Sequence, residues 1–362
     1  GENTSQQREH RINLYRSPKK RHNKQSENLS SLIHLGPTYT MMSLQFKPEQ
    51  NSQDDDIVDC AVAKMDPRDV RESISVMFQQ EEHYLCDDYL RESERQLNCL
   101  NPPSAGTQHH PDRSEQGEPV DALCRAKICE WIFQVVDFTK LQRETVSIAM
   151  SYLDRFLCSS SPRAQRALND RKEYQLAALT TLYIAVKLFE PLAMDAELVS
   201  KLSRGLHTPD EITEFEYDIL CALKWRVQGP TTFQFVNYIM ELLPVSAESM
   251  KPTLFDFSHF QVEIATGDYA FVPLRRSTIA IAAVLNALEG IPPSDLPFGE
   301  RISFIRSIGT VIDFDIFSPE INAVRMRLLD SFAQYSGYEL SQVAGLTPII
   351  RKARSTSRCN SL

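Results

Sequence analysis

The chain has 362 residues, of which 42% are hydrophobic, and a formal net charge of -9 at pH 7. A chain of this length can build one large domain or two medium ones, with room for disordered ends. The acidic balance gives no overall attraction to nucleic acid or to an anionic membrane, and no apolar run approaches the length of a bilayer-spanning helix. No signal peptide opens the chain. We therefore expect neither a nucleic-acid partner nor a membrane partner.

Residues 1–66 are polar and unpatterned, so we expect them to be disordered. Their first part is basic. Ser17 begins a Ser-Pro-Lys-Lys sequence that matches the consensus of proline-directed kinases, so it is a candidate phosphorylation site. Residues 19–21 could serve in nuclear import. A solvated charge run is an equally good interpretation of this segment.

From residue 67 to residue 97 the pattern is helical, with Val70, Ile74 and Met77 on one face. Residues 98–119 contain Pro, Gly and Ser with few apolar residues, which predicts a linker.

A first helical unit is predicted over residues 120–227. Its five helices are expected from the core stripe around Ile128, then at about 143–157, 174–189 and 196–202, and finally after Thr208. The third is apolar nearly all round and should be central. Thr208 should cap the fifth, because a proline and two acidic residues follow it.

A Gly-Pro pair at residues 229–230 marks the join to a second helical unit, residues 228–336. Its expected helices lie at 232–242, 254–269, 277–288, 298–308 and 319–335. The tail, residues 337–362, is basic and rich in Ser and Thr. The sequence therefore predicts an all-α protein with disordered termini.

The sequence gives no sign of chemistry of its own. The eight cysteines are scattered without CxxC or Cys/His metal spacing, which predicts neither a zinc site nor a disulfide framework. There is no glycine-rich phosphate loop, no GxSxG and no HExxH. We expect a reduced intracellular protein with no catalytic residues, no metal and no cofactor.

Four charges stand inside otherwise apolar helical stripes: Arg125, Asp154, Lys187 and Glu216. A buried ion is costly unless it is paired. Arg125 and Asp154 could satisfy each other inside the molecule. Lys187 and Glu216 have no comparable local partner, which points to a partner outside the chain.

The sequences around these charges are CRAKICEW at residues 124–131, YLDRFL at 152–157 and KLFE at 187–190. In their order and spacing they resemble the cyclin box, the helical domain by which cyclins bind and activate cyclin-dependent kinases. With a weaker second repeat, the resemblance covers about two-thirds of the chain. It implies the cyclin fold, with two five-helix repeats preceded by an N-terminal helix.

The resemblance implies roles for the four charges. Arg125 and Asp154 would form a buried charge pair between the first two helices, the alternative being two unrelated surface charges. Lys187 and Glu216 would contact the kinase through charge-assisted hydrogen bonds, and Phe189 could add an apolar anchor. The alternative is an ordinary intramolecular salt bridge on a wet surface.

The resemblance also implies a shallow groove for Arg-x-Leu segments of substrates and inhibitors, built from Cys124, Ile128, Trp131 and Gln175. The chain departs from the family in two places. Cys124 replaces the usual Met, and Gln134 stands where an acidic residue often meets the arginine of the peptide. Alternatively, Ile128 and Trp131 are plain core residues.

The implied function is a non-catalytic regulatory subunit that binds and activates a cyclin-dependent kinase and so controls cell-cycle progression in nucleus and cytoplasm. Residues 150–157 and 223–225 favour a D-type-like, G1/S cyclin, although the LxCxE motif of many D-type cyclins is missing. The alternatives are a transcriptional cyclin, another cyclin-fold transcription factor, or a helical scaffold without a kinase.

Overall fold

The computed structural model describes residues 65–91, 119–191, 194–311 and 315–336, which all belong to one compact unit that begins at Met65. Ser17, the basic residues 19–21 and the tail lie outside the described residues, as does nearly all of the predicted linker. Throughout the described ranges the regular elements are helices, and no strand is present. The predicted all-α class is confirmed.

Helix α2 (Pro67–Glu81) begins at Asp66, whose side chain accepts a hydrogen bond from the Arg68 amide. The helix ends at Glu81, earlier than expected, and a 3₁₀ turn follows as η2 (Glu82–Tyr84). The chain must change direction there because its two sides enter different hydrophobic cores. Val70 packs in one core, whereas Tyr89 packs in the other. The predicted single helix over residues 67–97 is therefore interrupted: residues 85–88 are not helical, residues 89–91 are helical again, and residues 92–97 lie outside the described residues.

The first group of helices follows the predicted order with one addition. Its members are α4 (Ala122–Thr139), α5 (Glu144–Leu157), α6 (Pro162–Asn169), α7 (Arg171–Phe189), α8 (Ala196–Leu202) and α9 (Pro209–Ala222). Helix α6 was not predicted, because the serines and Pro162 were interpreted as the end of the preceding helix. Ser161 instead caps α6 and Pro162 occupies its first turn, where proline is well tolerated.

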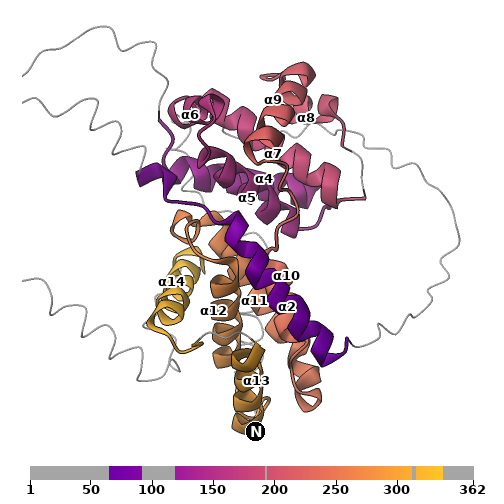
Figure 1. The fold of residues 1–362 in the computed structure, drawn as a ribbon, viewed down its shortest axis with the longest axis vertical. Coiled ribbons are helices and arrows are strands. Elements are labelled where there is room, and N and C mark those ends of the chain that lie inside the picture. Colours follow the sequence, from indigo (N-terminus) through magenta and orange to yellow (C-terminus); the bar gives the residue numbers. More distant parts are fainter. Residues whose placement is uncertain (1–64, 92–118, 192–193, 312–314, 337–362) are drawn as a thin grey trace, which may run out of the picture. The chain divides into compact units, whose positions relative to one another are not determined.

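The second group lies close to the predicted ranges. Its members are α10 (Thr232–Met240), η3 (Val245–Met250), α11 (Lys251–Gly267), η4 (Tyr269–Phe271), α12 (Arg276–Gly290), α13 (Phe298–Val311) and α14 (Pro319–Ser336). Helix α2 packs against α10, and both α10 and α14 pack against α12 (Figure 1). The core of this group is completed by apolar residues of α2.

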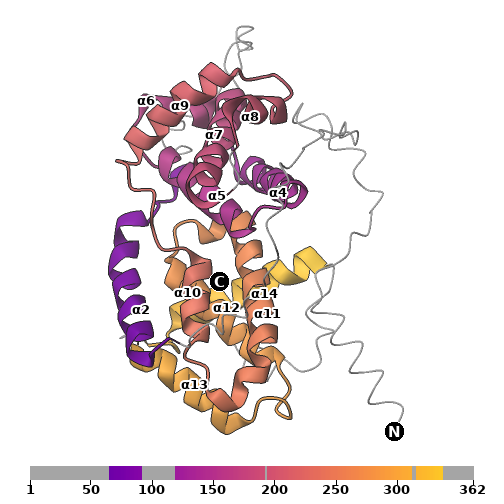
Figure 2. The same cartoon turned by 90° about the vertical axis from the view of Figure 1, so that its right-hand side faces the viewer.

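Helix α7 positions the candidate site. It is buried along most of its length, as predicted, and packs against both α5 and α9 (Figure 2). Helix α9 starts at a capping box in which Thr208 and Glu211 exchange hydrogen bonds. Because α7 and α9 are neighbours, the exposed end of α7 lies beside the middle of α9.

Candidate functional site

Lys187 and Glu216 bind each other across α7 and α9. The Lys187 Nζ lies 2.9 Å from Oε1 and 3.2 Å from Oε2 of Glu216. The Lys187 side chain is 52% exposed and that of Glu216 is 12% exposed. Neither residue has a local partner, as expected, but the two pair with each other, which is the intramolecular salt bridge named above as the alternative. The partner is 29 residues away in the sequence, so local periodicity could not find it.

This pair leaves the lysine available for further contacts. Its hydrogen bond to Glu216 raises the pKa of Lys187, while partial burial lowers it, and the net shift is upward. The Nζ also lies 5.4 Å from the centre of the Tyr183 ring. An ammonium group has three N–H donors, and the exposed half of the side chain faces solvent.

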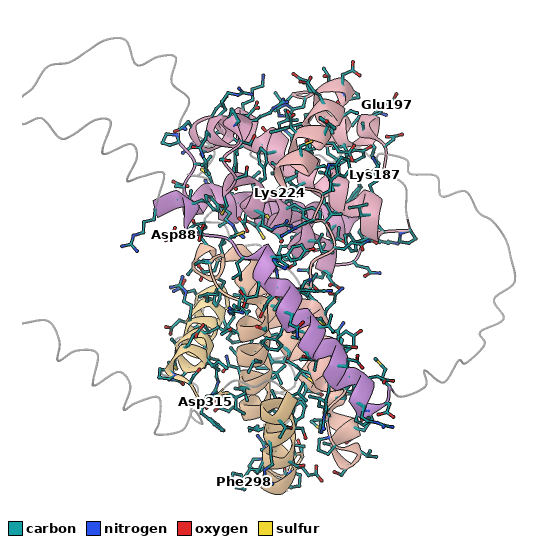
Figure 3. The ribbon with its side chains drawn as sticks, in the orientation of Figure 1. Asp88, Lys187, Glu197, Lys224, Phe298 and Asp315 are labelled. Carbon is teal, nitrogen blue, oxygen red and sulfur yellow. The ribbon has the colours of Figure 1, made fainter. Side chains whose placement is uncertain are left out.

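Exposed apolar residues adjoin both members of the pair in the sequence. Leu188 and Phe189 at the end of α7 are 45% and 37% exposed, and Tyr217, next to Glu216, is 64% exposed. Phe189 was identified from the sequence, whereas Leu188 and Tyr217 were missed. The sequence signal that could have identified them is their position: Leu188 directly follows Lys187, and Tyr217 directly follows Glu216. We call Lys187, Leu188, Phe189, Glu216 and Tyr217 the α7–α9 face; Figure 3 labels Lys187 within it.

The turn after α9 holds a second unusual feature. Lys224 and Trp225 both adopt left-handed backbone conformations, with φ of 54° and 58°. Such angles are uncommon for residues other than glycine and costly for bulky ones. The Trp225 amide donates to the Leu220 carbonyl at 2.9 Å, and the side chain remains 61% exposed. A large aromatic ring is thus held in solvent at the end of α9 by a strained backbone.

The residue after α7 fixes the end of that helix. Glu190 accepts hydrogen bonds from the Gln142 amide at 2.9 Å and from the Thr145 hydroxyl. Gln142 lies just before α5 and Thr145 lies in its first turn. These contacts tie the last turn of α7, and with it Lys187, to the neighbouring helix.

Arg125 and Asp154 form the second charge pair, which joins α4 to α5. The guanidinium donates from Nε to Oδ1 and from Nη2 to Oδ2, each at 2.8 Å. The side chains are 3% and 7% exposed. Arg125 also donates to the Thr266 carbonyl of α11 at 2.9 Å, and the Tyr89 hydroxyl donates to Asp154 at 3.0 Å. The pair therefore connects four parts of the chain, two more than the sequence indicated.

The charges of this pair compensate each other. Burial alone would lower the pKa of Arg125, but the Asp154 carboxylate and its hydrogen bonds raise it well above its ordinary value. The guanidinium therefore stays charged. Since the pair is almost completely buried and both carboxylate oxygens accept hydrogen bonds from Arg125, removing one partner would leave the other charge buried and unpaired.

The residues of the expected docking groove divide between core and surface. Cys124 and Ile128 are 6% and 5% exposed and belong to the core of the first group. Trp131 packs against that core while partly exposed, Gln134 is exposed and Gln175 is half-buried. Only the last three could meet a peptide directly.

Within the described ranges, no group of three or more His, Cys, Asp or Glu side chains is placed to hold a metal ion. None of the described helices is both long enough and apolar enough to span a membrane.

One known protein family matches a segment that includes all helices of the first group. Residues 79–228 match the family described as Cyclin, N-terminal domain. This part of the chain is a cyclin N-terminal domain. Both charge pairs, the α7–α9 face and Trp225 lie inside the matched residues, so all of them are features of a cyclin domain.

Individual cyclins match at similar levels. Cyclin-A1-4 of Oryza sativa subsp. japonica is 26% identical over 185 residues, which are 51% of this chain and 50% of that protein. G1/S-specific cyclin-D2 of Mus musculus is 28% identical over 176 residues, which are 49% of this chain and 58% of that one. The chain thus matches about half the length of these relatives. A-type and D-type cyclins match almost equally well.

Among solved structures, a viral cyclin from herpesvirus saimiri has a TM-score of 0.48 and 20% sequence identity, over 60% of this chain and 90% of that one. The CAK complex from Chaetomium thermophilum bound to ATP-gamma-S has a TM-score of 0.42 and 17% identity, over 80% of this chain and 84% of the matched one.

Proposed function

We propose that this cyclin is a non-catalytic regulatory subunit that binds a cyclin-dependent protein kinase through the α7–α9 face. The observation that carries the proposal is the Lys187–Glu216 ion pair, whose lysine is half exposed and whose neighbours in the sequence include the exposed apolar residues Leu188 and Tyr217. A surface pair of this kind contributes little to folding. An interface, in contrast, gains from charged donors that become desolvated beside apolar anchors.

The α7–α9 face offers each type of contact that such an interface needs. Lys187 can donate to carbonyl or carboxylate oxygens of the kinase while Glu216 keeps it oriented. Leu188, Phe189 and Tyr217 supply the apolar area that excludes water from those hydrogen bonds. Trp225 is a further exposed aromatic residue just beyond the end of α9.

Regulation would follow from differential binding. A cyclin that binds the active conformation of the kinase more tightly than the inactive one shifts the population toward activity. The phosphoryl-transfer chemistry stays in the kinase. No catalytic residue of this chain is required.

The subtype, substrates and location are finer parts of the proposal. Residues 150–157 and 223–225 favour a D-type-like cyclin acting at G1/S. Substrates or inhibitors with Arg-x-Leu segments would dock at the exposed edge formed by Trp131, Gln134 and Gln175. The basic residues 19–21 support a nuclear as well as a cytoplasmic location.

The test is capture of cyclin-dependent kinases from a purified panel by the immobilised full chain, followed by a phosphorylation assay of the captured kinase. We expect the double variant Lys187→Ala, Glu216→Ala to lose capture. The matched control is Lys251→Ala, Glu241→Ala, which removes a surface ion pair of 2.8 Å from the second group. Equal capture by the wild type and by the folded Lys187, Glu216 variant would refute the proposed face.

A further inference from the structure

Two cysteines from distant parts of the sequence meet beside the first core. Cys86 lies in the segment between η2 and Tyr89, and Cys158 is the C-terminal cap of α5. The two thiols are close enough for Cys158 to raise the pKa of Cys86. The Cys158 Sγ also lies 3.4 Å from the Asp87 carbonyl oxygen, next to Cys86 in the chain. Both thiols are free in the structure.

The pair differs in accessibility. Cys86 is 9% exposed, whereas Cys158 is half-buried and can be reached from solvent. The neighbouring Cys158 thiol, together with burial, raises the pKa of Cys86 well above its ordinary value. An oxidant should therefore meet Cys158 first, with Cys86 as the protected neighbour that reacts second.

Two guanidinium groups lie near these thiols. Arg276 donates to the Tyr84 carbonyl at 3.1 Å and to the Ser151 hydroxyl at 2.7 Å, and Arg155 stacks over the Tyr84 ring at 4.7 Å. Both arginines interact electrostatically with Cys86. Arg276 also interacts electrostatically with the carboxylates of Glu81 and Asp154. The charge of Arg276 lowers the pKa of Cys86, but the Cys158 thiol and burial outweigh it, so Cys86 gives up its proton only as it reacts.

We propose that Cys86 and Cys158 form a reversible disulfide in response to a peroxide. The Cys158 thiolate attacks one oxygen of hydrogen peroxide, the O–O bond breaks, and the leaving hydroxide takes a proton to become water. The Cys86 thiolate then attacks the sulfur of the resulting sulfenic acid. The S–S bond forms, and the departing hydroxide takes the proton given up by Cys86. Two thiols and one peroxide thus give one disulfide and two waters.

The disulfide would make permanent a junction that is now held by weaker bonds. Tyr89 donates to Asp154, and the Tyr269 hydroxyl donates to Asp88 at 2.9 Å. These contacts fasten the segment that joins α2 to the first group. A covalent link from Cys86 to the end of α5 would prevent the segment from opening, so the oxidised protein should melt at a higher temperature than the reduced one. This inference does not depend on kinase binding.

The test is peptide mapping of the full chain after treatment with hydrogen peroxide and alkylation of the remaining thiols. We expect a linked peptide containing Cys86 and Cys158, about 2 Da lighter than its two reduced parts, because two hydrogens are lost. A thiol reductant should remove it. The Cys221→Ser variant, which changes an exposed cysteine on α9, should form the same link.

The Cys86→Ser variant tests the order of events. Without its resolving partner, Cys158 should retain the sulfenic acid and be labelled by a 1,3-diketone probe, whereas the wild type should not be. The proposal is overturned if Cys86 and Cys158 remain fully alkylated at a peroxide dose that oxidises Cys221. Should Cys86→Ser fail to fold, the map of the wild-type chain decides alone.

Discussion

The two charge pairs of this cyclin domain are built from the same chemistry and lie in opposite environments. Arg125 and Asp154 are almost completely buried and connect four parts of the chain, whereas the Lys187 side chain is half exposed and its pair connects only α7 and α9. A buried pair is strongly coupled to folding, since losing one member strands the other. An exposed pair is weakly coupled to folding and free to serve another partner. We therefore assign the first pair to the fold and propose that the second serves binding.

The largest expected effect comes from breaking the buried pair. Arg125→Ala should lower the free energy of unfolding by about 3–5 kcal/mol, because it strands Asp154 and leaves the Thr266 carbonyl without its donor. Urea denaturation of the full chain measures this loss. Arg125→Met combined with Asp154→Leu should cost less than the single change, since no charge is then left unpaired. An unchanged midpoint for Arg125→Ala would mean that the pair does not hold the fold.

A smaller effect is expected where the two helical groups join. A Cβ atom at Gly229 would lie 2.5–2.7 Å from three atoms of the Tyr84 ring. Gly229→Ala should therefore destabilise the protein by about 1–3 kcal/mol, as overpacking typically does. Gly267→Ala is the matched control, because nothing lies within 4 Å of the added atom. Thermal melts of the two variants should separate clearly, and equal melting temperatures would show that the ring moves aside freely.

Backbone strain at Trp225 should have a smaller effect on the free energy of unfolding. Here, unusually, the glycine variant should be more stable than the alanine variant. A left-handed backbone costs roughly 1–2 kcal/mol for a residue with a Cβ atom and almost nothing for glycine. Trp225→Gly should therefore be more stable than Trp225→Ala by about 1 kcal/mol, although both lose the exposed ring and should capture kinase less well. Urea denaturation of the two variants checks the order. Higher stability of the alanine variant would argue that the turn relaxes when tryptophan is removed.

The smallest effect on stability is expected at the exposed pair. Lys187→Ala with Glu216→Ala should change the free energy of unfolding by no more than about 1 kcal/mol, the usual limit for a solvated ion pair. The same urea titration provides the comparison with Arg125→Ala. A loss as large as that of Arg125→Ala would place this pair in the fold and weaken its assignment to binding.

Local signals in the sequence predicted most of the helices. The predicted range of α8 equals the observed helix, and Thr208 caps α9 as its neighbours indicated. Local signals failed where one residue is compatible with both the end of one helix and the start of the next. Pro162 both ends one helix and starts the next, so α6 was missed. Helix α2 ends at Glu81 because of the separate cores on either side of it, which periodicity does not reveal.

The candidate site was predicted less completely, because it depends on how helices pack, which local patterns do not reveal. The sequence identified Lys187 and Glu216 as charges in apolar stripes, but their ion pair depends on the packing of α7 against α9. Likewise, the exposure of Tyr217 and the burial of Ile128 follow from which side of each helix meets the core. A short apolar pattern does not distinguish an exposed anchor from a core residue.

The most direct test of the division between fold and binding is the affinity of the Lys187→Ala, Glu216→Ala variant for a purified cyclin-dependent kinase that the wild-type chain binds. If the pair serves binding, this variant should bind the kinase at least about tenfold more weakly than the wild type, equivalent to about 1.4 kcal/mol. It should unfold at nearly the wild-type urea concentration. Wild-type affinity in that folded variant would show that the Lys187–Glu216 pair is not part of the kinase-binding surface.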